Sequence, residues 1–315
     1  MWPRFAGGVG ADLPAAAAER FPSWTVIAAL APAAAVGVFY FGARALLLLA
    51  GCTAGCTAFE ALLRRLPGGA PAVSGRGALT GLLLGMCLPP ASPAWLALAG
   101  CAVATLAGRM TFGTLGFNPV NPVLVARVVL TTAFPIPMTT WSEPGGIFVG
   151  ASAVAVAPAT FGTGSVNLLD GLIGRIPGGA GETSVVALGL GGVFLLWRGA
   201  TAWQIPVSFL GGVAALAAVL NALAPERFPG PGVHLVTGGL VFAALFLAAD
   251  PRTAPTTARG RLIFGAGCGV LVWVLRTFGD HPAGVPWAIL LMNALTPLID
   301  LYSGSRGAEE GETGG

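Results

Sequence analysis

The sequence predicts an all-α integral membrane protein that forms one domain over residues 1–315. Only 9% of its residues are charged, whereas a soluble globular protein carries about 25%. Hydrophobic types make up 55% of the chain, so the chain has too few charges to cover a water-exposed surface of its own. These hydrophobic residues fall into about ten apolar runs, which are typical of membrane-spanning helices.

The ten apolar runs alternate with polar breaks, and each run predicts one helix. In chain order they cover residues 24–41, 43–63, 77–88, 93–108, 121–134, 185–197, 205–223, 233–249, 262–275 and 285–301. Five of them are shorter than the roughly 17–25 residues of a simple span. Short runs interrupted by Gly and Pro often mark broken or re-entrant helices around a site. Flanking Gly and Thr residues can also lengthen such runs, so both interpretations stay open.

Two of the runs end in similar breaks. The third run closes with LGMCLPPASPAW, and the eighth closes with LFLAADPRTAPTT, five runs later. An odd number of runs in each half would give the two halves opposite topology, and inverted repeats of this kind place their sites near the middle of the membrane. Chance similarity between two apolar stretches explains the match equally well.

The arginines predict which side of the membrane each break faces, because positive residues favour cytoplasmic segments. With the N-terminus inside, the inner segments hold Arg4, Arg20, Arg64, Arg65, Arg76, Arg109, Arg198, Arg252, Arg259, Arg261 and Arg306, and the outer segments hold Arg44, Arg175, Arg227 and Arg276. This excess predicts cytoplasmic N- and C-termini. It also predicts a long extracytoplasmic loop, residues 135–184, between the two halves. This side depends on an odd number of spans before Pro135, so one miscounted run would place the loop in the cytoplasm.

The stretch FGTLGFNPVNPVLVARVVL, residues 112–130, contains the main candidates for a site within the membrane. Asn118 and Asn121 each precede a proline, which removes a backbone donor and disfavours a helical conformation at the residue before it. Their amides can therefore bind a ligand or the freed backbone. Arg127 lies about two turns further on, where a charge normally faces the bundle or a polar cavity. Two roles remain open for Arg127: contact with an anion or electron carrier, and pairing with helix-end carbonyls.

The other polar residues predict no metal site and no nucleic-acid interface. Cys52 and Cys56 lie on one helix face, but no His, Asp or further Cys clusters with them. His234 and His281 are isolated, and the net charge of +3 is spread along the chain without a basic run. Asp250, in the break after the eighth run, is interpreted as part of a charged cytoplasmic turn.

Several stretches in combination resemble the RnfD/NqrB family, which comprises membrane subunits of ion-translocating, flavin-dependent electron-transfer complexes. They are LPPASPAW, FGTLGFNPVNPVLVARVVL with FPIPMTTW, GETSVVALGLGGVFLLWR followed by TAWQIPVSFLGG, DPRTAPTTARGRLIFG and GVPWAILLMNALTPLID. The resemblance runs from about residue 24 to 302. It favours the RnfD branch over the quinone-reducing branch, whose N-terminal part is longer. It implies ten helices in two inverted halves, similar to urea transporters.

The resemblance also implies a covalent FMN, joined by a phosphoester to the threonine of a Ser-Gly-Ala-Thr motif outside the cytoplasm. The matching position is Thr160 in APAT, where Ala157 and Pro158 depart from the Ser and Gly of the motif. Arg175 in the same loop is expected either to pair with the phosphate or to remain a solvated loop residue.

A second GAT, Gly199–Thr201, falls at a predicted inner helix end, where the family carries no flavin. A second, noncovalent flavin (riboflavin) is also considered.

The function implied by the resemblance is electron transfer through covalent FMN, coupled to movement of Na⁺ or H⁺, in a ferredoxin:NAD oxidoreductase of the Rnf type. The partners would be the other membrane and peripheral subunits of that complex in the bacterial inner membrane, including a second FMN-carrying subunit and iron–sulfur subunits. Two alternatives stay open. One is a transporter or channel of urea-transporter-like fold without a redox centre, and the other is a membrane subunit of a quinone-reducing Nqr-type complex.

Overall fold

The chain folds into a bundle of α-helices to which a short two-stranded ribbon is added. The computed structural model describes residues 23–65, 75–114, 120–145, 152–155, 167–278 and 284–312. The helices are α2 (Ser23–Arg64), α3 (Arg76–Cys87), α4 (Ala94–Thr114), α5 (Pro122–Ala133), α6 (Pro135–Thr139), α9 (Leu168–Ile173), α10 (Val185–Trp197), α11 (Gln204–Leu223), α12 (Pro231–Val236), α13 (Leu240–Phe242), the π-helical turn η1 (Ala243–Leu247), α14 (Ala258–Phe278) and α15 (Gly284–Glu312). Nine of the ten predicted runs each coincide with one of these helices or with part of one, and the eighth run, 233–249, covers α12, α13 and η1.

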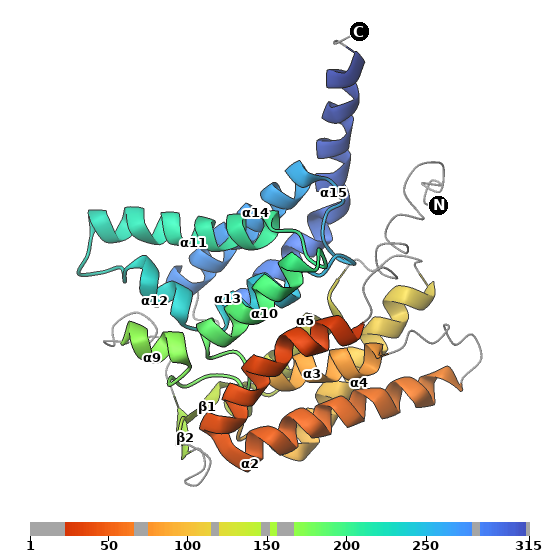
Figure 1. Ribbon diagram of the computed structural model, residues 1–315, viewed down its shortest axis with the longest axis vertical. Coiled ribbons are helices and arrows are strands. Elements are labelled where there is room, and N and C mark those ends of the chain that lie inside the picture. The colour runs from red at the N-terminus through yellow and green to blue at the C-terminus, as the bar shows by residue number, and fades with distance from the viewer. Residues whose placement is uncertain are drawn as a thin grey trace.

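The first two predicted runs meet at Gly42 and form the two arms of α2. Gly42 has φ 70° and ψ −155°, a conformation that glycine adopts because it has no Cβ. Figure 1 shows the chain turning sharply between the red and the orange arm. A straight helix of 42 residues would be about 63 Å long, roughly twice the hydrocarbon thickness of a bilayer. The turn therefore divides α2 into two arms of spanning length.

The eighth predicted run, 233–249, is a broken helix instead of a continuous one. Gly238 and Gly239, each with φ 63°, separate α12 from α13 and η1. The guanidinium of Arg276 on α14 donates to the backbone oxygens of His234, Thr237 and Gly238 at 2.9, 3.1 and 3.1 Å. These bonds satisfy carbonyls that an interrupted helix leaves without a partner, so the break is a supported part of the fold.

The short helix α3 is closed at its C-terminal end by a distant segment. The backbone N–H groups of Gly181 and Ala180 donate to the carbonyls of Met86 and Leu88 at 3.2 and 3.0 Å. The carbonyl of Ala180 in turn packs against Gly37 of α2, where a Cβ would collide with it. The glycine-rich segment before α10 is therefore inserted between α2 and the end of α3.

The lengths and surfaces of the helices confirm an all-α integral membrane protein. Among the described residues, α2, α11, α14 and Gly284–Gly304 of α15 are long and apolar enough to cross a membrane, and α3, α5, α10 and Ala94–Gly108 of α4 are shorter apolar helices. Large side chains such as Trp197, Leu223 and Leu47 are 80%, 75% and 71% exposed, which suits a lipid environment. The number of spans, the inverted repeat and the likeness to urea transporters stay predictions.

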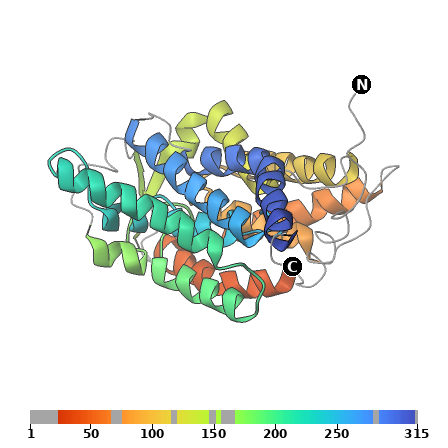
Figure 2. The same ribbon diagram turned by 90° about the horizontal axis from the view of Figure 1, so that it is seen from above.

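The polar connections gather at opposite ends of the bundle. The strands β1 (Thr140–Glu143) and β2 (Ser152–Ala155) pair antiparallel, with Thr140 opposite Ala155. This ribbon and α9 lie at one end of the bundle, and the C-terminal ends of α2 and α4 lie at the other end (Figure 1). Helices α11 and α14 pack side by side, as both views show (Figure 2). Which end faces the cytoplasm, and hence the side of the 135–184 loop, stays a prediction.

Candidate functional site

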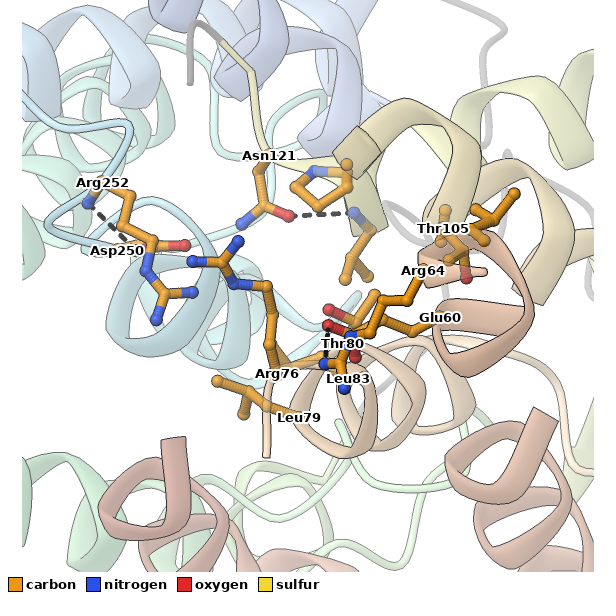
Figure 3. Close-up of a pocket in the computed structure, with 16 residues that line it drawn as sticks. Glu60, Arg64, Arg76, Leu79, Thr80, Leu83, Thr105, Asn121, Asp250 and Arg252 are labelled. Carbon is orange, nitrogen blue, oxygen red and sulfur yellow. Dashed lines mark hydrogen bonds and ion pairs between the residues drawn. The ribbon is translucent and has the colours of Figure 1, made fainter. Parts of the chain in front are cut away.

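A polar cavity lies where the end of α2 and the break after η1 meet the first turns of α3 and α5 (Figure 3). Its volume is about 890 Å³, counting its open mouth. The residues that line it are Glu60, Leu63, Arg64, Arg76, Gly77, Leu79, Thr80, Leu83, Ala104, Thr105, Gly108, Asn121, Pro122, Val123, Asp250 and Arg252. It thus combines leucine and valine walls with a cluster of charged and amide groups.

Three guanidinium groups and two carboxylates face this cavity. Arg64 Nη2 donates to Glu60 Oε1 at 2.7 Å across one helical turn. The backbone N–H of Arg252 donates to Asp250 Oδ1 at 3.1 Å. Figure 3 shows the side chain of Arg76 between these two pairs. Three positive charges against two negative ones leave the cavity positive, so it favours an anionic or electron-rich ligand.

Asn121 joins the two halves of the chain at the edge of the cavity. Its Oδ1 accepts from the backbone N–H of Val123 at 3.0 Å, so it is the N-cap of α5, with proline at the first helical position as such helix starts favour. Its Nδ2 donates to the carbonyl of Leu247 at the end of η1, at 3.3 Å. The side chain is 2% exposed, which means that both bonds are shielded from water.

Replacing Asn121 by alanine is expected to destabilise the protein by about 2–4 kcal/mol. One part of the effect is the lost N-cap, worth about 1 kcal/mol, and the rest is the buried carbonyl of Leu247 left without its donor, worth about 1–3 kcal/mol. The measurement is the thermal unfolding of the purified protein. The matched control is Asn167→Ala, because Asn167 caps the short helix α9 at an exposed site, accepting from Leu169 N at 3.0 Å. Equal shifts in both variants would contradict the cross-half role of Asn121.

Arg127 pairs with Glu182 deeper in the bundle. Arg127 Nη1 donates to Glu182 Oε2 at 2.7 Å, and Nη2 donates to Oε1 at 3.2 Å. Oε1 also accepts from the backbone N–H of Gly179 at 3.2 Å, while Gly239 lies so close that a Cβ there would approach Oε2 to 2.5 Å. The two side chains are 11% and 3% exposed. This pair holds the inserted glycine-rich segment against α5.

The structure brings some predicted site residues together and separates others. Asn121 lines the cavity, and Arg127 lies one to two turns further along α5, bound to a carboxylate. It is Arg276, and not Arg127, that donates to helix-end carbonyls. Arg175 is exposed just after α9. Asn118 and Thr160 lie outside the described residues, so their roles stay predictions.

Sequence reasoning missed the contributions of Arg76 and Glu182, whereas the pairing of Glu60 with Arg64 follows from their spacing of four residues on one helix. Glu182 lies two residues before the N-cap of α10 in GETS, where Ser184 Oγ accepts from Ala187 N at 3.3 Å. That capping motif could have signalled an ordered segment instead of a free loop. Its partner on α5 lies 55 residues away, and no local pattern indicates such a pairing.

Known proteins resemble this chain over most of its length. The D subunit of the ion-translocating oxidoreductase complex of Halorhodospira halophila is 40% identical, covering 87% of each chain. The protein of the same name from Stutzerimonas stutzeri is 38% identical over 87% of this chain and 88% of its own. That of Escherichia coli O157:H7 is 35% identical over 89% and 92%. Residues 19–308 match the sequence profile of the NQR2, RnfD, RnfE family.

The matched region contains the inserted glycine-rich segment, the short helix α3, the broken helix of residues 233–249 and the polar cavity. Its boundaries agree with those of the resemblance seen in the motifs, which covers about residues 24–302. With a profile match from residue 19 to residue 308 and relatives at 35–40% identity, this chain is a member of the NQR2, RnfD, RnfE family.

Proposed function

We propose that this chain is a membrane subunit of an ion-translocating oxidoreductase complex of the Rnf type. The observation that supports the proposal best is the 40% identity to the Halorhodospira halophila protein over 87% of both chains. In such a complex the chain passes electrons through bound flavin while the complex moves Na⁺ or H⁺, and it is not active alone. Its partners are the other membrane and peripheral subunits, including a second FMN-carrying subunit and iron–sulfur subunits. The complex lies in the bacterial inner membrane, with both termini of this chain in the cytoplasm.

The proposed attachment point for covalent FMN is Thr160, which lies in the sequence between β2 and α9. Its hydroxyl oxygen can form the phosphoester that the family motif requires. The phosphate keeps a negative charge, which disfavours burial in hydrocarbon without a partner, and Arg175 nearby in the sequence is a candidate for pairing with it. The flavin supplies the redox chemistry when bound, and the chain supplies position and electrostatics.

Peptide mass spectrometry of the chain, purified from cells able to attach flavin, tests the covalent link. Cleavage after arginine places Thr160 in the peptide from Val128 to Arg175, which is expected to carry FMN in phosphoester linkage. Detection of the unmodified peptide alone would contradict the link. Membership in the complex is tested separately, by purifying a tagged chain and measuring the iron–sulfur and flavin absorbance that accompany it. A flavin-free chain that purifies alone would favour a transporter or channel.

We propose the polar cavity as the site of the second, noncovalent flavin. Leu79, Leu83 and Val123 provide apolar walls for a flat ring, while Arg76 provides a charged group for its edge. A positive charge near the ring is one way in which a protein tunes a flavin toward its reduced, anionic form.

Leu83→Trp is expected to lower the noncovalent flavin content at least about tenfold, because the larger side chain fills the cavity wall. The content is measured by chromatography of the flavin released on acid denaturation, and the covalent flavin, measured by in-gel fluorescence, is expected to stay unchanged. Leu106→Trp is the matched control, since Leu106 is 49% exposed on the outer surface of α4. Equal release from the wild type and from Leu83→Trp would overturn this placement.

A further inference from the structure

We propose that a second cavity, between the α10–α11 turn and the break after η1, binds the phosphate group of an anionic phospholipid. The cavity measures about 870 Å³ with its open mouth, and its polar side chains are Thr201, Gln204 and Arg261. The proposal is independent of the flavin chemistry above. It also gives a role to the Gly199–Thr201 motif, which forms one wall of the cavity.

Arg261 provides the positive charge in this cavity. Its Nε donates to the carbonyl of Pro255 at 3.0 Å, which fixes the plane of the guanidinium and leaves its two terminal amino groups available. A fixed guanidinium recognises phosphate through two parallel bonds. The hydroxyl of Thr201 adds a donor, and no carboxylate is found among the described residues that line the cavity. The cavity therefore attracts a phosphate without a competing negative charge.

Gln204 indicates that the headgroup also carries donors. Its Oε1 is buried and has no hydrogen-bond partner in the described part of the chain, and such an atom normally finds a partner. The hydroxyls of a glycerol headgroup, as in phosphatidylglycerol, would donate to this oxygen. Helix α11 begins at the same point: Gln204 and Ile205 of its first turn line the cavity, and the side chain of Trp203 at its N-cap makes no capping bond.

The cavity lies at the level where a lipid headgroup is found. Helix α10 ends at Trp197, and α11 and α14 begin at Gln204 and Ala258, so three apolar helices end around it. Trp197 and Trp203 flank the turn with exposures of 80% and 56%, and exposed tryptophan is enriched where hydrocarbon meets headgroups. This end of the bundle carries the arginine excess that predicts the cytoplasmic side, where basic pockets between helices bind anionic headgroups.

The test uses the intact complex in nanodiscs that contain a photoactivatable phosphatidylglycerol, with crosslinks mapped by peptide mass spectrometry. Labelling is expected in the segments 199–205 and 249–261. Arg261→Gln is expected to lower it about tenfold, because one charge-assisted contact to phosphate is lost. Arg261→Lys keeps the charge and is expected to retain part of the labelling. Thr201→Val, which leaves the arginine in place, is expected to lower the labelling about threefold by removing one neutral hydrogen bond.

Arg227→Gln is the matched control, since it removes one exposed arginine after the C-terminal end of α11, at the opposite end of that helix; its labelling is expected to equal that of the wild type. The proposal is overturned if Arg261→Gln and Thr201→Val both label like the wild type. It is also overturned if a phosphatidylcholine probe labels the same segments equally, because the site would then not select an anionic headgroup. The proposal is overturned as well if inorganic phosphate binds at Arg261 while the phosphatidylglycerol probe leaves both segments unlabelled, because the site would then be one for free phosphate.

Discussion

Thr160→Ala is expected to remove the covalent flavin from this chain completely. Alanine has no hydroxyl oxygen, so the phosphoester cannot form at this position. In-gel flavin fluorescence of the chain should fall to background, and the peptide from Val128 to Arg175 should appear only in its unmodified form. Because the flavin supplies the redox chemistry, electron transfer through the complex should fall to background as well.

Two variants make this result specific. Thr160→Ser keeps a hydroxyl at the same position and is expected to retain flavin, whereas Thr163→Ala removes a hydroxyl three residues further on and is expected to change nothing. If Thr160→Ala still fluoresces, the attachment lies elsewhere, and Thr201 in the second GAT is the next hydroxyl to replace. That outcome would also contradict the assignment of the attachment to the 135–184 loop.

The side of the membrane can be tested at the same residue. All five native cysteines are buried, so a cysteine placed at position 160 can be labelled over a low background. A membrane-impermeant maleimide is expected to label Thr160→Cys in intact cells whose outer membrane has been made permeable. Labelling only after the inner membrane is opened would place the residue in the cytoplasm and contradict the predicted topology.

Composition and run length predicted the helices well, because a helix in lipid must satisfy its own backbone and therefore needs a continuous apolar sequence. The runs 77–88 and 185–197 agree with α3 and α10 to within one residue. The run 233–249 is broken in the structure, since the pair Gly238 and Gly239 adopts positive φ within an apolar stretch. Glycine is common in membrane helices, so its presence alone does not reveal a break.

The site was harder to predict than the helices because it is built from contacts between distant segments. Asn121 was a candidate from its place before a proline, and the structure shows that it caps α5. Its second bond reaches Leu247, 126 residues away, and nothing in the local sequence specifies that partner. Arg127 was also a candidate, but its carboxylate partner lies in a glycine-rich stretch that resembles a solvated loop. Pairing of this kind is decided by tertiary packing.

Glu182→Ala is expected to cost about 3–5 kcal/mol of stability, because it leaves the guanidinium of Arg127 buried without its counter-charge. It also removes the acceptor for Gly179 N and so frees the inserted segment from α5. The expected readouts are a lower unfolding temperature of the purified complex and a lower amount of the chain in the membrane. Glu60→Ala is the matched control. The Glu60–Arg64 pair has the same 2.7 Å contact, but its side chains are 22% and 37% exposed, and an exposed pair contributes only about 0–1 kcal/mol.

A double variant separates the charge from the contact. Replacing Arg127 and Glu182 together by leucine removes both buried charges, and such apolar replacements are often neutral or stabilising in comparison with the pair. The double variant is therefore expected to be more stable than Glu182→Ala and to recover most of the lost unfolding temperature. If it is as unstable as the single variant, the hydrogen bonds to the inserted segment matter more than the unpaired charge. If Glu182→Ala itself unfolds like Glu60→Ala, the pair does not hold the inserted segment, and other contacts such as the backbone bonds of Ala180 and Gly181 must do so.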